Sequence, residues 1–213
     1  LVIATLLWAD LSNRFVWAVL MVTLGFGGIG FIDDAIKLSR RSPNGLSGKV
    51  KISLEIVIAL IAASWISEIA RDPLSTSLAV PFMKNVLVEL GWFFFPFAAV
   101  VMVGTSNAVN LTDGLDGLAI GTVLIAAAAF TVLPYVTGHA QFAAYLDLIQ
   151  IPRIWELTIF GGAMVGASLG FLWFNCYPAQ MFMGDVGSLA LGSAIGTVAL
   201  LIKQELLLVL VGG

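Results

Sequence analysis

Apolar residues come in long runs, and short polar segments separate one run from the next. Six runs carry at most one charged residue each: 15–32, 52–67, 90–112, 117–138, 157–184 and 186–202. The one exception inside them is Glu55, near the start of its run. A helix needs about 20 apolar residues to cross a bilayer. The pattern therefore predicts six full membrane spans, with partial spans at 1–9 and 206–211.

These spans are expected to be helices, because the strands of a membrane barrel alternate apolar and polar residues. No soluble module or low-complexity segment interrupts them. The predicted fold class is all-α, a polytopic transmembrane helix bundle, with residues 1–213 forming a single membrane-embedded domain. Small residues indicate where helices come close. Two sets stand out: the regularly spaced Gly162, Gly166 and Gly170, and the crowded Gly25, Gly27, Gly28 and Gly30.

Composition agrees with a lipid environment. The chain is 60% hydrophobic and 11% charged, whereas soluble domains carry about 25% charged residues. One cysteine and one histidine exclude an internal disulfide and a two-histidine metal site. No nucleic-acid partner is expected. The chain begins and ends within apolar stretches, so we expect it to be the middle of a longer protein that lacks both ends.

Three acidic segments lie at the ends of apolar runs: 31–37, 107–116 and 182–188. Carboxylates in or beside a membrane span are costly and usually functional. Five of the thirteen acidic residues belong to these segments: Asp33, Asp34, Asp113, Asp116 and Asp185.

Basic residues indicate the orientation of the spans. The segment 33–51 holds Lys37, Arg40, Arg41, Lys49 and Lys51, half of all Lys and Arg. The excess of basic residues in cytoplasmic loops places this segment in the cytoplasm. Two spans separate the first acidic segment from the second, and two more separate the second from the third. All three segments are therefore expected at the same cytoplasmic surface.

Carboxylates that converge with amide side chains suit Mg²⁺. The lysines of the first segment and its loop (Lys37, Lys49 and Lys51) suit phosphate oxygens. Together they predict phosphoryl transfer, in which catalysis is mostly positioning and charge neutralisation. The alternative is an ion-coupled transporter, whose acids would lie near the middle of the membrane rather than at span ends.

Simpler roles remain open for several of these residues. Asp33 and Asp34 could cap the start of a loop, and Asp113 and Asp116 could cap the helix that follows them. Asp185 could be the N-cap of the helix at 186–202. Asn175 could be a buried structural amide, and Phe182 could serve in packing.

Four stretches match the motifs of a known family in their usual order: Leu6–Arg14, Gly30–Lys37, Gly104–Leu118 and Phe174–Leu191. With them the chain resembles the polyprenyl-phosphate N-acetylhexosamine-1-phosphate transferase superfamily. The stretch Asn-Leu-Thr-Asp-Gly-Leu-Asp-Gly at 110–117 resembles the muramoyl-pentapeptide branch more than the branches that use UDP-N-acetylglucosamine. Activity on UDP-N-acetylglucosamine is the alternative within this superfamily.

The resemblance implies a multi-pass enzyme of the bacterial inner membrane with a cytoplasmic active site. The implied reaction moves phospho-MurNAc-pentapeptide from UDP-MurNAc-pentapeptide to undecaprenyl phosphate, gives lipid I and UMP, and needs Mg²⁺. A homodimer is a further possibility that the resemblance implies. The family's histidine-rich loop and its Thr-Met-Gly-Gly motif are not found in these 213 residues, which agrees with an expected fragment.

The resemblance also implies roles for single residues. Asp33, Asp34 and Asp185 would be catalytic, with Asp185 as the metal ligand. Asp33 would deprotonate the lipid phosphate or attack as a nucleophile, and Asp34 would support placement of metal or substrate. Substrate-binding roles would fall to Lys37, Lys49, Asn107, Asn110, Asp113, Asp116, Asn175 and Phe182, with the two lysines on phosphate and Phe182 stacked on uracil.

Overall fold

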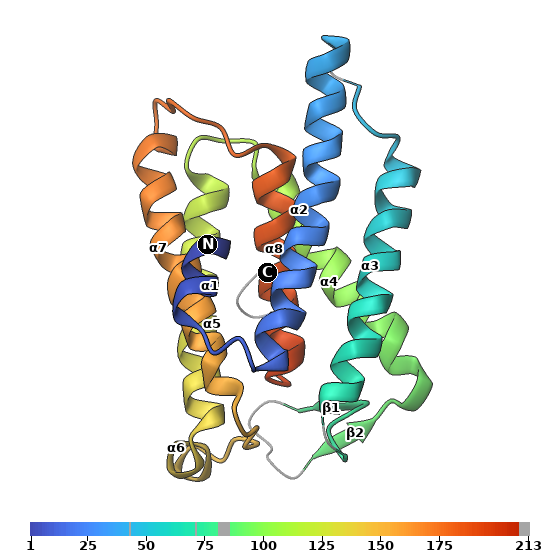
Figure 1. Ribbon diagram of the computed structural model, residues 1–213, viewed down its shortest axis with the longest axis vertical. Coiled ribbons are helices and arrows are strands. Elements are labelled where there is room, and N and C mark those ends of the chain that lie inside the picture. Colours follow the sequence, from blue (N-terminus) through green and yellow to red (C-terminus); the bar gives the residue numbers. More distant parts are fainter. Residues whose placement is uncertain (43, 71, 81–85, 209–213) are drawn as a thin grey trace.

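Helices make up most of the protein. The computed structural model describes residues 1–42, 44–70, 72–80 and 86–208. Its elements are α1 (Val2–Trp8), α2 (Arg14–Arg40), α3 (Gly48–Ile69), β1 (Ser77–Ala79), β2 (Leu87–Glu89), η1 (Gly91–Phe93), α4 (Phe94–Thr112), α5 (Leu118–Gly138), α6 (Ala140–Tyr145), η2 (Ile154–Glu156), α7 (Leu157–Asn175) and α8 (Gly184–Leu201). Within the described ranges, six helices are long and apolar enough to cross a membrane. The predicted polytopic helical bundle is confirmed (Figure 1).

Helix α8 lies at the centre of the bundle, with α2 and α4 packed along it. In its most apolar stretch 67% is buried, against 28% for α3. Gly192 lets α4 approach closely, because a Cβ there would lie 2.5 Å from the carbonyl oxygen of Thr105. A buried hydrogen bond from Ser106 Oγ to the Leu189 carbonyl, 3.1 Å long, joins the same two helices. The start of α8 is therefore held between α2 and α4.

Two helix ends differ from the sequence prediction. The uncharged run 157–184 is not one span, because α7 ends at Asn175 and residues 176–183 form no helix. Pro178 lacks the N–H that a helix interior needs, so absence of charge alone was a poor guide there. Conversely, α2 continues through Asp33 and Asp34 to Arg40. These acids therefore lie inside a helix and do not cap the start of a loop.

The partial spans have different outcomes. Residues 2–8 form the short helix α1, which packs beside α7. Of the stretch 206–211, residues 209–211 lie outside the described part of the chain.

A small hairpin is the exception to the all-α prediction. Strands β1 and β2 pair antiparallel, with Ser77 opposite Glu89. The hairpin and α6 lie at the bottom of Figure 1, whereas α2 reaches past the other helices at the top. Pairing of two three-residue strands satisfies backbone groups in a segment that connects two spans.

The regularly spaced glycines of α7 do not form the predicted packing face. A Cβ at Gly162, Gly166 or Gly170 would meet no described atom within 4 Å. The glycines of α2 differ among themselves. Gly28 also has open space beside it, whereas Gly30 touches the backbone of α8.

Candidate active site

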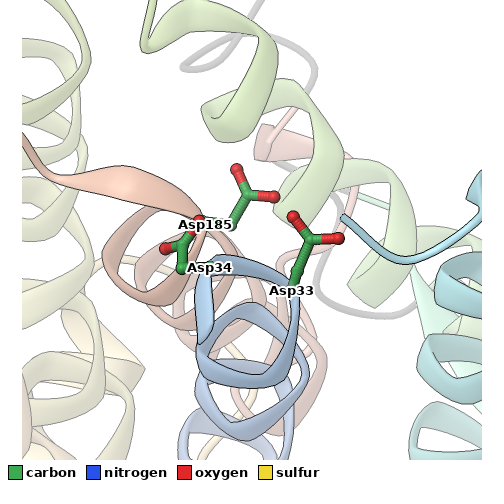
Figure 2. A group of neighbouring side chains, drawn as sticks. All are labelled: Asp33, Asp34 and Asp185. Atoms are coloured by element: carbon green, nitrogen blue, oxygen red, sulfur yellow. The ribbon is translucent and has the colours of Figure 1, made fainter. Parts of the chain in front are cut away.

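Three aspartates from two distant parts of the chain meet at the upper end of the bundle. Asp33 and Asp34 lie near the end of α2, and Asp185 lies in the first turn of α8 rather than at its N-cap, which is Met183. One carboxylate oxygen from each lies within 4.8 Å of the other two. Figure 2 shows Asp33 and Asp34 on α2 with Asp185 beside them. We call Asp33, Asp34 and Asp185 the aspartate cluster.

Gly30 is what allows α2 and α8 to meet at this point. A Cβ on residue 30 would lie 2.3 Å from the Asp185 carbonyl oxygen and 2.6 Å from the Val186 nitrogen. These are backbone atoms, so no side-chain rotation could make room for it. The predicted close approach before Asp33 is confirmed at this glycine.

Asp33 is the most buried member of the cluster, with 3% of its surface exposed. Its Oδ1 accepts a 2.6 Å hydrogen bond from the backbone N–H of Leu46, in the loop between α2 and α3. The ammonium of Lys37, one helical turn later, forms an ion pair with Oδ2. Asp34 is less enclosed, and its Oδ2 accepts a long 3.4 Å hydrogen bond from the N–H of Val186.

Two lysines converge on Asp185. Lys37 Nζ lies 3.2 Å from Asp185 Oδ2, and Lys51 Nζ lies 2.7 Å from the same oxygen. The other oxygen, Oδ1, accepts a 2.8 Å hydrogen bond from the amide of Asn110 on α4. The same amide nitrogen donates to Ser188 Oγ at 2.8 Å. Helices α2, α3, α4 and α8 thus all contribute to one polar centre.

The centre has the chemistry of a site for a divalent cation and phosphate. Its three carboxylates offer the oxygen ligands that Mg²⁺ prefers. Two ammonium groups partly balance their charge and are the type of group that binds phosphate oxygens. The donor set therefore fits the cation that the sequence analysis expects.

The loop 176–183, which we call the wall, connects α7 to the start of α8, where Asp185 lies. Asn175 is 3% exposed; its Oδ1 accepts from the N–H of Gly117 at 3.1 Å, and its Nδ2 donates to the Met181 carbonyl at 2.8 Å. Asp116 Oδ2 accepts from the N–H of Ala179 at 3.0 Å. Asn175 is thus a buried structural amide. The hydrogen bond to Asp116 joins the wall to the loop that follows α4.

Phe182 lies on the wall, and 78% of its side chain is exposed. The packing role left open for Phe182 is not found among the described residues. An exposed ring beside a polar centre is suited to stack on a planar ligand.

Asp113 is the C-cap of α4, and no described hydrogen bond joins its side chain to the cluster. Burial raises the pKa of its carboxyl, and the negative charge of Asp185 raises it further. The second acidic segment also meets the third directly, because the amide of Asn110 donates to Asp185 Oδ1 at 2.8 Å. The span count that placed all three segments at one end is confirmed.

Two predicted site residues are placed differently from the cluster. Lys49 is exposed at the start of α3, and no described contact joins its ammonium to the three aspartates. Asn107 points its amide nitrogen at the buried Glu55, 2.6 Å from Oε2.

The sequence alone does not indicate the contacts of two charged residues on α3. Lys51 is expected only as one of three lysines suited to phosphate, yet it makes the shortest contact with Asp185. Glu55 is expected only as a charge near the start of a span. Their separation of four residues, which puts both on one helix face, was the signal available.

Two comparisons with known proteins bear on the function of this chain. The model of the family named glycosyl transferase family 4 matches residues 16–203. A phospho-N-acetylmuramoyl-pentapeptide-transferase from Granulibacter bethesdensis is 57% identical over 211 residues, which cover 99% of this chain. The chain spans 58% of the length of that curated relative.

Proposed function

We propose, because the chain belongs to glycosyl transferase family 4, that its aspartate cluster serves a phosphoglycosyl transfer. The proposed reaction moves phospho-MurNAc-pentapeptide from UDP-MurNAc-pentapeptide to undecaprenyl phosphate, which gives lipid I and UMP. The similarity to a transferase of that name supports this choice of substrates. The site belongs to a multi-pass membrane protein, so an acceptor with a long lipid tail could approach it from the bilayer.

The observation that carries the proposal is the junction of three carboxylates with two lysines. Lys37 Nζ and Lys51 Nζ both contact Asp185, and Lys37 also pairs with Asp33. Phosphoryl transfer needs groups that position phosphates and neutralise their charge. A cation-transport site would lack the lysines and lie near the membrane midplane, whereas this cluster lies at the helix ends.

Asp185 and Asp34 would hold Mg²⁺, which when bound neutralises charge on the pyrophosphate and on the UMP leaving group. Lys37 would turn from the carboxylates to phosphate oxygens. The exposed Lys49 would also bind phosphate oxygens, from the start of α3. Asn110 would keep Asp185 in place through the bond to Oδ1.

Asp33 would act on the lipid phosphate. Its buried carboxylate is oriented by the Leu46 N–H and by Lys37, and such a group can take a proton from the acceptor before attack. The exposed ring of Phe182 would stack on the uracil of the nucleotide, next to the wall that Asn175 and Asp116 shape. Asp113 would lie at the edge of the same nucleotide site.

The site would face the cytoplasm of the bacterial inner membrane. The basic residues Arg40 and Arg41 at the end of α2 and the lysines at the start of α3 gather at the end that carries the cluster. Cytoplasmic loops carry such an excess of positive charge.

The test is an assay of the full-length natural protein in detergent with undecaprenyl phosphate and Mg²⁺. We expect UMP release and a lipid-linked product with UDP-MurNAc-pentapeptide, and none with UDP-N-acetylglucosamine. Asp185→Asn should lower turnover by more than about 10²-fold, a loss typical of removing an electrostatic contact.

Glu89→Gln is the matched control, because Glu89 is an exposed acid on β2 at the other end of the bundle. It should leave turnover unchanged. Near-normal activity of Asp185→Asn would refute the site assignment. Product from UDP-N-acetylglucosamine alone would replace the proposed substrate with the alternative one.

A further inference from the structure

Glu55 is a fully buried acid on α3, with 0% of its surface exposed. Its Oε2 accepts a 2.6 Å hydrogen bond from the amide of Asn107. Its Oε1 is buried and has no hydrogen-bond partner among the described residues. A buried carboxylate oxygen without a partner is costly, so this oxygen needs an explanation.

Lys51 lies one helical turn before Glu55 on the same face of α3. Side chains four residues apart start about 5–6 Å from each other on a helix. The positive charge of Lys51 and the negative charge of Asp185 both act on the Glu55 carboxyl. In the structure, however, the Lys51 ammonium contacts Asp185 Oδ2 at 2.7 Å. The Lys51 ammonium thus contacts the Asp185 carboxylate and also interacts electrostatically with the Glu55 carboxylate.

Lys51 and the proposed divalent cation would compete for the Asp185 carboxylate. Both are positively charged, and Asp185 is the proposed metal ligand. Only 15% of the Lys51 side chain is exposed, so water cannot readily replace the lost ion pair. An ammonium that leaves Asp185 therefore needs another acceptor nearby, since a buried unpaired charge is strongly unfavourable.

We propose that Glu55 is a positioning residue that receives the Lys51 ammonium on Oε1 when a divalent cation occupies Asp185. The hydrogen bond from Asn107 holds Oε2 and leaves Oε1 available. The pair Glu55–Lys51 would then free Asp185 for the cation without leaving either partner unpaired. This inference rests on the cation site of the proposed function.

The test measures binding of Mn²⁺ alone to the full-length natural protein in detergent, from the loss of the free Mn²⁺ signal in electron paramagnetic resonance. Mn²⁺ accepts the same oxygen ligands as Mg²⁺. Glu55→Gln should raise the Kd about tenfold, the size typical for residues behind metal ligands. Glu68→Gln, an exposed acid on the same helix, should leave the Kd unchanged.

Lys51→Met separates competition from a general effect of charge. Because this change removes the competitor, Mn²⁺ should bind more tightly than to the unaltered protein. In the Lys51→Met background, Glu55→Gln should change the Kd by less than about twofold, because coupled residues are not additive. A general electrostatic or packing role would produce the tenfold loss in both backgrounds.

An unchanged Kd in Glu55→Gln would overturn the inference, as would equal losses in the two backgrounds. Gel filtration shows whether Glu55→Gln folds. If it does not fold, the Lys51→Met variant becomes the test, and weaker Mn²⁺ binding by that variant than by the unaltered protein would refute competition. Asp185→Asn must abolish Mn²⁺ binding. If it does not, the cation site itself is wrong, and both proposals fall. If Asp185→Asn abolishes Mn²⁺ binding but Glu55→Gln has the Kd of the unaltered protein, only the role of Glu55 is refuted.

Discussion

Each aspartate of the cluster is held by a different set of donors, which suits different tasks. Asp33 is enclosed by a backbone N–H and Lys37, whereas Asp185 meets two lysines and an amide. Among the described residues, Asp34 has only long contacts, of 3.4 Å, to Lys37 and Val186. The most loosely held carboxylate is the one with most freedom to turn toward a ligand.

Asp113 provides a prediction about pH and stability. Burial and Asp185 raise its pKa, so the folded protein binds this proton more readily than the unfolded chain does. Stability therefore falls as pH rises through the raised pKa, and the penalty vanishes as pH falls toward the ordinary value of 3.8.

Asp113→Asn removes that penalty. At pH 8 we expect the Tm to rise by about 1–2 °C, the size of a partly screened repulsion of about 0.5 kcal/mol. The gain should shrink as the pH is lowered. Thermal unfolding in detergent across this range measures it, with Glu89→Gln as a control of equal charge change. A Tm gain that is independent of pH would contradict the electrostatic cause.

Between elements, the contact of α2 with the first turn of α8 decides whether the cluster forms. Gly30→Ala places a Cβ against the α8 backbone and should destabilise the protein by about 1–3 kcal/mol, as overpacking does. Because the aspartates would move apart, Mn²⁺ binding should weaken as well. Thermal unfolding and the Mn²⁺ titration measure the two effects.

Gly28→Ala is the matched control on the same helix, two residues away. A Cβ there would meet no described atom within 4 Å, and alanine is favoured over glycine in a helix by about 1 kcal/mol. This variant should be as stable as the unaltered protein or more so, with the same Kd for Mn²⁺. Equal losses in the two variants would show that the close approach at Gly30 is not what matters.

The aspartate cluster and the β1–β2 hairpin lie at opposite ends of the bundle. The proposed topology assigns these two ends to opposite sides of the membrane. The single cysteine, Cys176, is exposed on the wall beside the cluster. Replacing it by serine allows two new probes, Leu115→Cys after α4 and Val88→Cys on β2. Both positions are exposed, at 70% and 44%.

In intact cells, an impermeant maleimide should label the Val88→Cys variant and not the Leu115→Cys variant. The unaltered protein, with Cys176, should also remain unlabelled. Inside-out vesicles should reverse the pattern. Labelling of Leu115→Cys or Cys176 from outside would contradict a cytoplasmic active site.

The apolar runs determined the number of spans, since crossing a bilayer requires long uncharged segments whatever their neighbours. Span parity and the motifs then predicted that distant acids would share one end. The ends of individual helices could not be predicted from hydropathy. Helix α7 ends at Asn175, before the uncharged run does, and α2 continues through Asp33 and Asp34. Both depend on local hydrogen bonding and breaker residues rather than on hydropathy.

Only the tertiary structure decided which side chains meet. The glycine pattern of α7 predicted packing but faces no described neighbour, whereas Gly30 makes the tightest approach of the described α2 glycines to the backbone of α8. Lys51 reaches Asp185 and Glu55 reaches Asn107 because α3 packs against α2 and α4, which no single-helix pattern reveals. Hydropathy acts along the chain and can be read from it, but contacts between helices depend on their packing and rotation.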